Sequence, residues 1–272
     1  MTFFRLLKIS RPRFWIYLLG PFLVGIAAAG VDQIWLLVLL GLYFTFPANL
    51  LVYGINDIFD YETDKNNPKK QGYEELVKPK DHRGLLLIIA ALNIPVLLLF
   101  PWLTNHAIQA MLWFWFFGIF YSAPPVRAKA IPIVDSIFNV LYVFPGVAVY
   151  SLLTDSWPPK EIIVAAALWT MAMHAFSALP DMKSDKKAKI ETVATKLGYK
   201  MTLFFCIDCY IAAGLLIYPH LGGMFTAIIV AIYLSIMTRA LIFKKELFQL
   251  YKAFPIVNLI VGFALFVYVQ HL

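Results

Sequence analysis

The sequence predicts an all-α membrane protein, and three observations lead to that prediction. Of the 272 residues, 61% are hydrophobic and only 14% are charged, whereas soluble domains carry about 25% charged residues. Apolar stretches of about 20 residues, the length that crosses a bilayer, recur along the chain. Basic residues gather at alternate ends of these stretches, as they do in multi-pass membrane proteins. The mean hydropathy of +0.74 therefore excludes a soluble helical enzyme.

Nine apolar stretches are counted as transmembrane helices. They are Phe14–Val31, Trp35–Ile55, Leu85–Leu103, Ala107–Tyr121, Pro132–Leu153, Ile162–Leu179, Met201–Tyr218, Gly223–Phe243 and Phe254–Gln270. The fourth is short for a span, and the others have the length that a helix needs to cross the hydrocarbon core.

The basic residues orient these spans. With the N-terminus in the cytoplasm, 22 of the 23 Lys and Arg residues fall on the cytoplasmic side, and only Lys160 lies outside. The net charge of +7 is then an orientation signal and an attraction to anionic lipid, so no nucleic-acid partner is expected. We expect an integral, multi-pass protein of the cytoplasmic (inner) membrane.

A polar segment at the end of the second span carries Asn56, Asp60 and Asp64 at spacing i, i+4, i+8. On a continuous helix these side chains share one face and drift by about 40° per step. Three such oxygen-bearing groups favour a cation among them. Mg²⁺ typically takes one or two carboxylates and completes its shell with water and substrate phosphate. The alternative interpretation is a solvated helix end.

A second acidic motif, Asp181 and Asp185 at spacing i, i+4, ends the sixth span. One such pair is weak evidence, but two clusters at the same end of membrane-length segments form a specific constellation. Four spans separate them, so both lie on the predicted cytoplasmic face. The chain is expected to be a single domain, 1–272, with two four-helix halves at about 1–130 and 131–250 and a ninth helix at 254–270.

Acidic motifs ringed by Lys and Arg residues suit a metal–diphosphate complex. Carboxylates hold the metal, which bridges to phosphate oxygens, and basic side chains neutralise the remaining charge. An allylic diphosphate bound in this way can ionise, because the metal stabilises the leaving group and the allyl cation is stabilised by resonance. The two cytoplasmic loops, 61–84 and 182–200, are the predicted segments long enough to cover such a site.

Further polar residues accompany the motifs. The fourth span ends in Tyr121-Ser-Ala-Pro-Pro, after which Arg127 and Lys129 either contact the diphosphate or anchor the orientation. Lys183, inside the second motif, is another diphosphate candidate. His174 lies seven residues before Asp181, on about the same helix face two turns deeper. There it either lines the ligand cavity or is a core histidine satisfied by a neighbour.

The pattern Asn-Asp-x2-Asp-x3-Asp at 56–64, the Asp-x3-Asp at 181–185 and the nine spans resemble the UbiA-type intramembrane prenyltransferases over the whole chain. The resemblance implies a helical bundle around a central cavity, with Mg²⁺ (or Mn²⁺) and a prenyl diphosphate at its cytoplasmic cap. It implies a metal–diphosphate set of Asn56, Asp60, Asp64, Asp181 and Asp185, with the four aspartates catalytic. Some branches carry Tyr-x3-Lys after the fourth span. Here position 125 is Pro, so either Arg127 or Lys129 takes the place of that lysine beside Tyr121.

Shorter strings narrow the resemblance. Ser10–Trp15 with Leu-Gly-Pro at 19–21, and the segment 51–60 with Asn-Pro-Lys-Lys at 67–70, look like the lycopene elongase branch. That branch implies C5 addition to a C40 carotenoid, a lipophilic acceptor. Aromatic prenyl transfer, as to 4-hydroxybenzoate, is one alternative, in which Arg11 and Arg13 would bind the acceptor carboxylate instead of anchoring the interface. A cation-coupled transporter is another.

Overall fold

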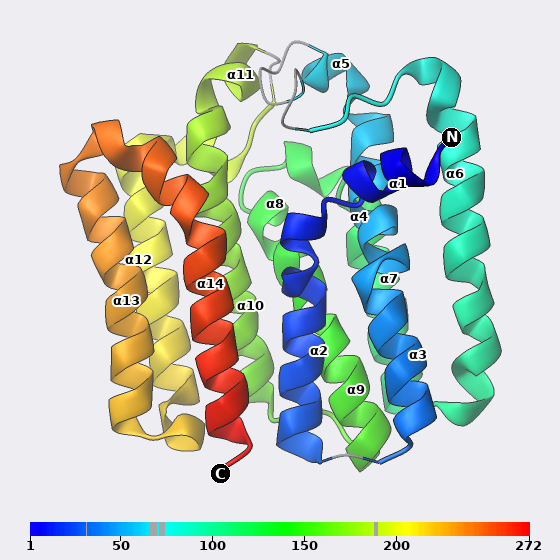
Figure 1. Cartoon of the computed structure of the whole chain (residues 1–272). Coiled ribbons are helices and arrows are strands. Elements are labelled where there is room, and N and C mark those ends of the chain that lie inside the picture. Colours follow the sequence, from blue (N-terminus) through cyan, green and yellow to red (C-terminus); the bar gives the residue numbers. More distant parts are fainter. Residues whose placement is uncertain (31, 66–69, 71–73, 188–189) are drawn as a thin grey trace. The chain divides into compact units, whose positions relative to one another are not determined.

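The computed structural model describes residues 1–30, 32–65, 70, 74–187 and 190–272, and every element in these ranges is helical (Figure 1). The chain divides into two compact units, each of which is continuous in space but not in sequence. Unit 1 comprises Met1–Arg127 and Phe144–Ser156, and unit 2 comprises Ala128–Val143 and Trp157–Leu272. The all-α prediction is confirmed for these residues.

Unit 1 holds both the N-terminal helices and one later helix. Its elements are α1 (Phe3–Ile9), η1 (Pro12–Phe14), α2 (Ile16–Ala29), α3 (Ile34–Thr45), α4 (Pro47–Phe59), α5 (Tyr61–Asp64), α6 (Pro79–Asn93), η3 (Ile94–Trp102), α7 (Asn105–Phe120) and α9 (Phe144–Thr154). Helix α9 packs against α2 at very short range (Figure 1). A Cβ on Gly25 would lie 2.5 Å from the carbonyl oxygen of Gly146, so this crossing requires glycine in both helices.

A buried polar chain links three helices of unit 1. The indole Nε1 of Trp115 donates to the Tyr43 hydroxyl at 2.6 Å, and that hydroxyl donates to Oδ1 of Asn93 at 3.0 Å. The amide of Asn93 donates in turn to the carbonyl oxygen of Ile89. Because hydrocarbon offers no alternative partners, these bonds fix α3, α6 and α7 against one another.

Unit 2 holds the remaining helices. Its elements are η4 (Ala128–Ala130), α8 (Val134–Ile137), η5 (Phe138–Tyr142), α10 (Lys160–Ala178), η6 (Leu179–Asp181), α11 (Met182–Lys187), α12 (Val193–Leu221), α13 (Gly223–Ile242), η7 (Lys244–Glu246) and α14 (Leu247–Val269). Helix α12 packs against α10 and α13. Tyr233 of α13 stacks on Tyr210 of α12 and donates to Asn258 of α14 at 3.0 Å.

Seven helices of the described residues are long and apolar enough to cross a membrane, and an eighth span results if one bent pair is counted. The bent pair is Val134–Tyr142 with Phe144–Thr154, which meet at 44°. The expected fifth span, Pro132–Leu153, thus corresponds to a broken helix, since Pro145 has no N–H to continue the helical bonding there. Helix α7 has 16 residues, too few for that count. Nine spans and a cytoplasmic N-terminus stay predictions.

The structure also shortens the two predicted loops. Helix α6 begins at Pro79, where a proline suits the first helical turn. Helix α12 begins at Val193, after a capping box made by Thr192 and Thr195. The 193–200 part of the predicted second loop is thus helical. Parts of these loops, 66–69, 71–73 and 188–189, lie outside the described residues, and with them the Asn-Pro-Lys portion of 67–70.

Candidate active site

The first motif lies where α4 gives way to α5. The backbone departs from helical geometry at Asp60, with φ −104° and ψ 5°, so the predicted continuous helix through the motif is interrupted there. The i to i+4 backbone bonds nevertheless continue, from Asp60 to the Asn56 carbonyl and from Asp64 to the Asp60 carbonyl. The amide Nδ2 of Asn56 donates to Oδ2 of Asp60 at 2.6 Å. The first and second motif residues are therefore brought together as the spacing predicted.

The segment after α7 supports this motif from the side. The Asn56 amide also donates to Oγ of Ser122 at 3.0 Å, and Ser122 is fully buried. Nδ2 of Asn56 thus donates two hydrogen bonds, which fix the orientation of the amide and of Asp60. Sequence reasoning selected Tyr121 from this segment and passed over its neighbour Ser122, which contacts the motif.

A buried ion-pair cluster lies beside the motif, and its centre is a residue that sequence reasoning passed over. Asp57 is 2% exposed. Its Oδ1 accepts from Nη2 of Arg11 at 2.7 Å and from Nζ of Lys70 at 2.6 Å. Arg11 lies 46 residues and Lys70 lies 13 residues from Asp57 in the sequence, beyond the reach of helical i, i+4 spacing, so no such spacing signalled the cluster. The carboxylate of Asp57 is thus committed to holding the chain together.

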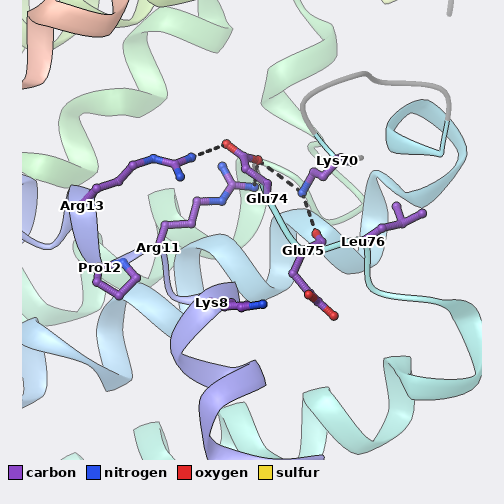
Figure 2. Close-up of a pocket in the computed structure, with 8 residues that line it drawn as sticks. All are labelled: Lys8, Arg11, Pro12, Arg13, Lys70, Glu74, Glu75 and Leu76. Atoms are coloured by element: carbon purple, nitrogen blue, oxygen red, sulfur yellow. Dashed lines mark hydrogen bonds and ion pairs between the residues drawn. The ribbon is translucent and has the colours of Figure 1, made fainter. Parts of the chain in front are cut away.

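Glu74 closes the cluster on its other side (Figure 2). Its carboxylate contacts Arg13 at 2.6 Å, Arg11 at 3.1 Å and Lys70 at 3.5 Å. Burial by itself would lower the pKa of Arg11, but Asp57 and Glu74 outweigh that effect and raise its pKa, so Arg11 stays charged. Arg11 and Arg13, candidates for interfacial anchoring or acceptor binding, both pair with carboxylates of this chain.

A pocket of about 490 Å³ opens beside this cluster within unit 1. Its lining is mostly charged and consists of Lys8, Arg11, Pro12, Arg13, Lys70, Glu74, Glu75 and Leu76 (Figure 2). The lining holds four basic and two acidic side chains, so the wall carries more positive than negative charge.

Lys70 links the cluster to the motif itself. Its Nζ lies 3.2 Å from Oδ2 of Asp64, and its side chain is 3% exposed. Asp64 is therefore accompanied by a buried ammonium, which screens its charge in the absence of another cation. Asp60 is 3% exposed, so the two motif carboxylates are both held close to the protein interior.

The second motif belongs to unit 2. Asp181 ends η6, and Asp185 lies in the following helix α11, where both are half-buried. The Ser184 hydroxyl donates to the Asp181 carbonyl, and the Ile190 N–H donates to the Asp185 carbonyl. Lys183 is exposed. The motif backbone is thus fixed by its own turn.

The predicted basic residues after α7 fall on either side of the boundary between the units. Arg127 is exposed, has a left-handed φ of 46°, and is the last residue of the first segment of unit 1. Lys129 is half-buried in η4 of unit 2. Tyr121 caps the C-terminus of α7 and is half-buried.

The donor set fits a hard divalent cation. Each unit presents two motif carboxylates, Asp60 with Asp64 and Asp181 with Asp185. That is the number Mg²⁺ commonly takes from a protein before water and phosphate oxygens fill its shell. Within the described residues, no group of three or more His, Cys, Asp or Glu side chains is arranged to hold a metal. A cation here would therefore draw further ligands from its substrate.

Three comparisons with known proteins agree with one another. Residues 18–268 match the model of the UbiA prenyltransferase family. A lycopene elongase/hydratase of Haloarcula japonica is 38% identical, with 94% of this chain and 88% of that protein aligned. One of Haloferax volcanii is 36% identical, with 93% and 84% aligned. The fold resembles a UbiA homolog from Archaeoglobus fulgidus bound to GPP and Mg²⁺, at TM-score 0.70 and 20% identity over 96% and 99% of the two chains. That homolog has also been solved with DMAPP and Mg²⁺.

Proposed function

Because the chain belongs to the UbiA prenyltransferase family, we propose that it transfers a C5 group from dimethylallyl diphosphate to lycopene within the membrane, in a Mg²⁺-dependent reaction. The chain is a prenyltransferase with several membrane-spanning helices. The observation that carries the choice of acceptor is its similarity, at 38% and 36% identity over nearly the whole chain, to two lycopene elongase/hydratases. The comparisons favour this enzyme over a transporter.

We assign the metal to the two acidic motifs. Asp60 and Asp64 of unit 1 and Asp181 and Asp185 of unit 2 would hold Mg²⁺, with Mn²⁺ as a possible substitute, and Asn56 would contribute Oδ1. The oxygen chemistry of these residues supports the assignment. When bound, the metal supplies Lewis-acid stabilisation of the diphosphate leaving group. Lys183, Arg127, Lys129 and Tyr121 are assigned to the diphosphate oxygens, as cations and as a hydroxyl donor.

The protein's own contribution is to position the reactants and to exclude water. Asn56 holds Asp60 in one orientation through its 2.6 Å bond, which keeps the donor end of the site preorganised. Heterolysis of the allylic C–O bond then releases diphosphate. The terminal double bond of lycopene attacks C1 of the allyl cation, so that a C–C bond forms and the positive charge moves to the acceptor. An alkene needs no base to activate it before this step, only a dry site.

The ion pairs in unit 1 favour an uncharged acceptor over an aromatic acid. Arg11 and Arg13 were the candidates for binding an acceptor carboxylate. Glu74 contacts both of them, and Arg11 also contacts Asp57. An acceptor such as 4-hydroxybenzoate would have to displace Glu74 and leave its carboxylate buried without those partners, which is costly. Lycopene has no carboxylate, so it would bind without displacing Glu74.

Two further features of the proposal follow from the family and the basic residues. The active face is proposed to lie at the cytoplasmic side of the inner membrane, where the prenyl diphosphate is soluble. Membrane lipid would surround the exposed apolar side chains, such as Leu98 and Leu215, each 73% exposed. The lipophilic acceptor would then enter from the bilayer.

The test uses the purified full chain in proteoliposomes that contain lycopene. Addition of dimethylallyl diphosphate and Mg²⁺ should yield a C45 and then a C50 carotenoid, detected by liquid chromatography and mass spectrometry. Asp181→Ala should give neither product, although it should insert and unfold like the unmodified chain. If lycopene is untouched while 4-hydroxybenzoate is prenylated under the same conditions, the proposed acceptor is wrong and the aromatic alternative holds.

A further inference from the structure

An ionisable pair in unit 2 has no role in the site described so far. Nε2 of His174, in the membrane-spanning helix α10, lies 3.4 Å from Oδ2 of Asp135, in α8. Asp135 is fully buried, and the His174 side chain is 15% exposed. Ionisable groups within spans are rare, usually pair with one another and commonly mark substrate or proton pathways. A buried carboxylate behind a partly accessible imidazole is also the arrangement in which a carboxylate orients a general base.

The position of His174 on α10 is the second observation. Met171, His174, Ser177 and Asp181 are half-buried, while most residues between them, such as Ala175 and Phe176, are buried. These four follow one face of the helix at spacings of three and four residues. That face runs from the second acidic motif to His174, which lies about 10 Å deeper at the usual helical rise. With its diphosphate held at the motif, as proposed above, an apolar prenyl group would extend in this direction.

Two backbone N–H groups hold the carboxylate of Asp135, in addition to His174. Its Oδ1 accepts from the N–H of Ser136 and its Oδ2 from the N–H of Val193, both at 2.8 Å. Val193 is the first residue of α12, so the carboxylate also caps the helix that follows the second motif. These two N–H donors fix the carboxylate that faces His174, and they tie its position to the loop that ends the motif.

We propose that His174, oriented by Asp135, is the base that accepts the proton released when the product cation is quenched; this rests on the proposed function. C–C bond formation leaves a positive charge on a tertiary carbon of the acceptor. Either the adjacent C–H bond supplies its electrons to a new double bond and its proton to His174, or water adds to the cation and gives its proton to His174. In both cases the imidazole becomes imidazolium opposite Asp135, and it returns the proton to water before the next turnover.

The geometry favours His174 over the motif carboxylates as this base. The aspartates of the motifs are assigned to the metal, and they lie at the diphosphate end of the site. The imidazole is deeper, partly accessible and backed by a negative charge, which stabilises the imidazolium that forms. Asp135, being fully buried, is a positioning residue that acts through His174.

The experiment compares two quantities in the same proteoliposomes with lycopene, dimethylallyl diphosphate and Mg²⁺. One is the diphosphate released, and the other is the amount of each extended carotenoid. For His174→Gln we expect diphosphate release to remain within a few-fold of the unmodified chain. The ratio of normal product to diphosphate should fall about tenfold or more, since a general base commonly contributes 10²–10⁴-fold. Double-bond isomers and free prenyl alcohol should account for the difference.

Two further variants keep the test decisive. Asp135→Asn should lower the same ratio by a smaller factor, and it carries the test if His174→Gln does not fold. His106→Gln, which alters an exposed histidine in unit 1, is the control and should leave the ratio unchanged. An unchanged ratio and product set in a folded His174 or Asp135 variant overturns the proposal. So does a parallel loss of diphosphate release and product, because His174 would then act before the cation forms.

Failure of the proposed function gives a different result. In that case the unmodified chain itself leaves lycopene untouched. If it prenylates an aromatic ring instead, that ring also loses a proton after C–C bond formation, so the same ratio of product to diphosphate decides the role of His174.

Discussion

The substitution Asp57→Asn tests whether the buried ion-pair cluster stabilises unit 1. Asp57 is 2% exposed and contacts Arg11 at 2.7 Å and Lys70 at 2.6 Å. Removing one partner of a buried ion pair costs about 3–5 kcal/mol, because a charge is left without compensation. Here Arg11 keeps Glu74 at 3.1 Å, and Lys70 keeps Asp64 at 3.2 Å. We therefore expect a loss of about 2–3 kcal/mol in the free energy of unfolding, below that range because these partners remain.

The assay is thermal unfolding of the purified chain in detergent, with the double variant Asp57→Asn, Arg11→Gln as the decisive comparison. For a chain of this size the expected loss lowers the unfolding midpoint by roughly 5–10 °C. The double variant should recover part of it, since removing both partners of a buried pair leaves no uncompensated charge. Glu62→Gln, at a carboxylate that is 79% exposed, is the control and should not shift the midpoint. A midpoint unchanged in Asp57→Asn, or a double variant less stable than the sum of the single changes, refutes the reasoning.

Three further predictions concern the metal, the orientation and the support of Asn56. Asp60→Ala should abolish turnover in a folded chain, and normal turnover in EDTA would show that no divalent metal is needed. In a background without the native cysteines, Lys80→Cys and Lys186→Cys should be labelled only from the cytoplasm; labelling of both from outside would reverse the orientation. Ser122→Ala should raise the Mg²⁺ concentration for half-maximal turnover about fivefold, the effect of one lost hydrogen bond of about 1 kcal/mol to Asn56. An unchanged Mg²⁺ titration would assign Ser122 no such role.

The apolar pattern predicted the membrane helices correctly where one apolar stretch forms one unbroken helix. The expected span 223–243 is found as α13, Gly223–Ile242. The bend in the fifth span could not be predicted, because hydropathy is insensitive to the break at Val143, where Pro145 and the close approach of Gly146 to Pro21 decide the geometry. The start of α12 was missed for another reason. Its capping box uses Thr at the third position, where the usual sequence signal is Glu or Gln.

In the candidate site, too, local contacts could be predicted from the sequence, whereas distant contacts could not. The Asn56–Asp60 bond follows from i, i+4 spacing and could be read from the sequence. Ser122 and Arg11 could not be identified in this way, because they reach the motif segment from 66 and 46 residues away. The role of Asp57 is also hidden in the sequence, since it differs from its neighbour Asp60 only in the partners that the fold supplies.

These partners separate the acidic side chains at the end of α4 by function. Asp57 is committed to Arg11 and Lys70, and Glu62 is largely exposed. Asp64 is intermediate between Asp57 and Glu62, because the ammonium of Lys70, which contacts Asp57, also lies 3.2 Å from Oδ2 of Asp64. A divalent cation binding at Asp64 would have to compete with Lys70, and the displaced ammonium would retain Asp57 and Glu74. Under the proposed metal assignment, Asp64 would pass to the metal without leaving a buried charge unpaired, and the ion-pair cluster of unit 1 would also set how strongly the metal binds.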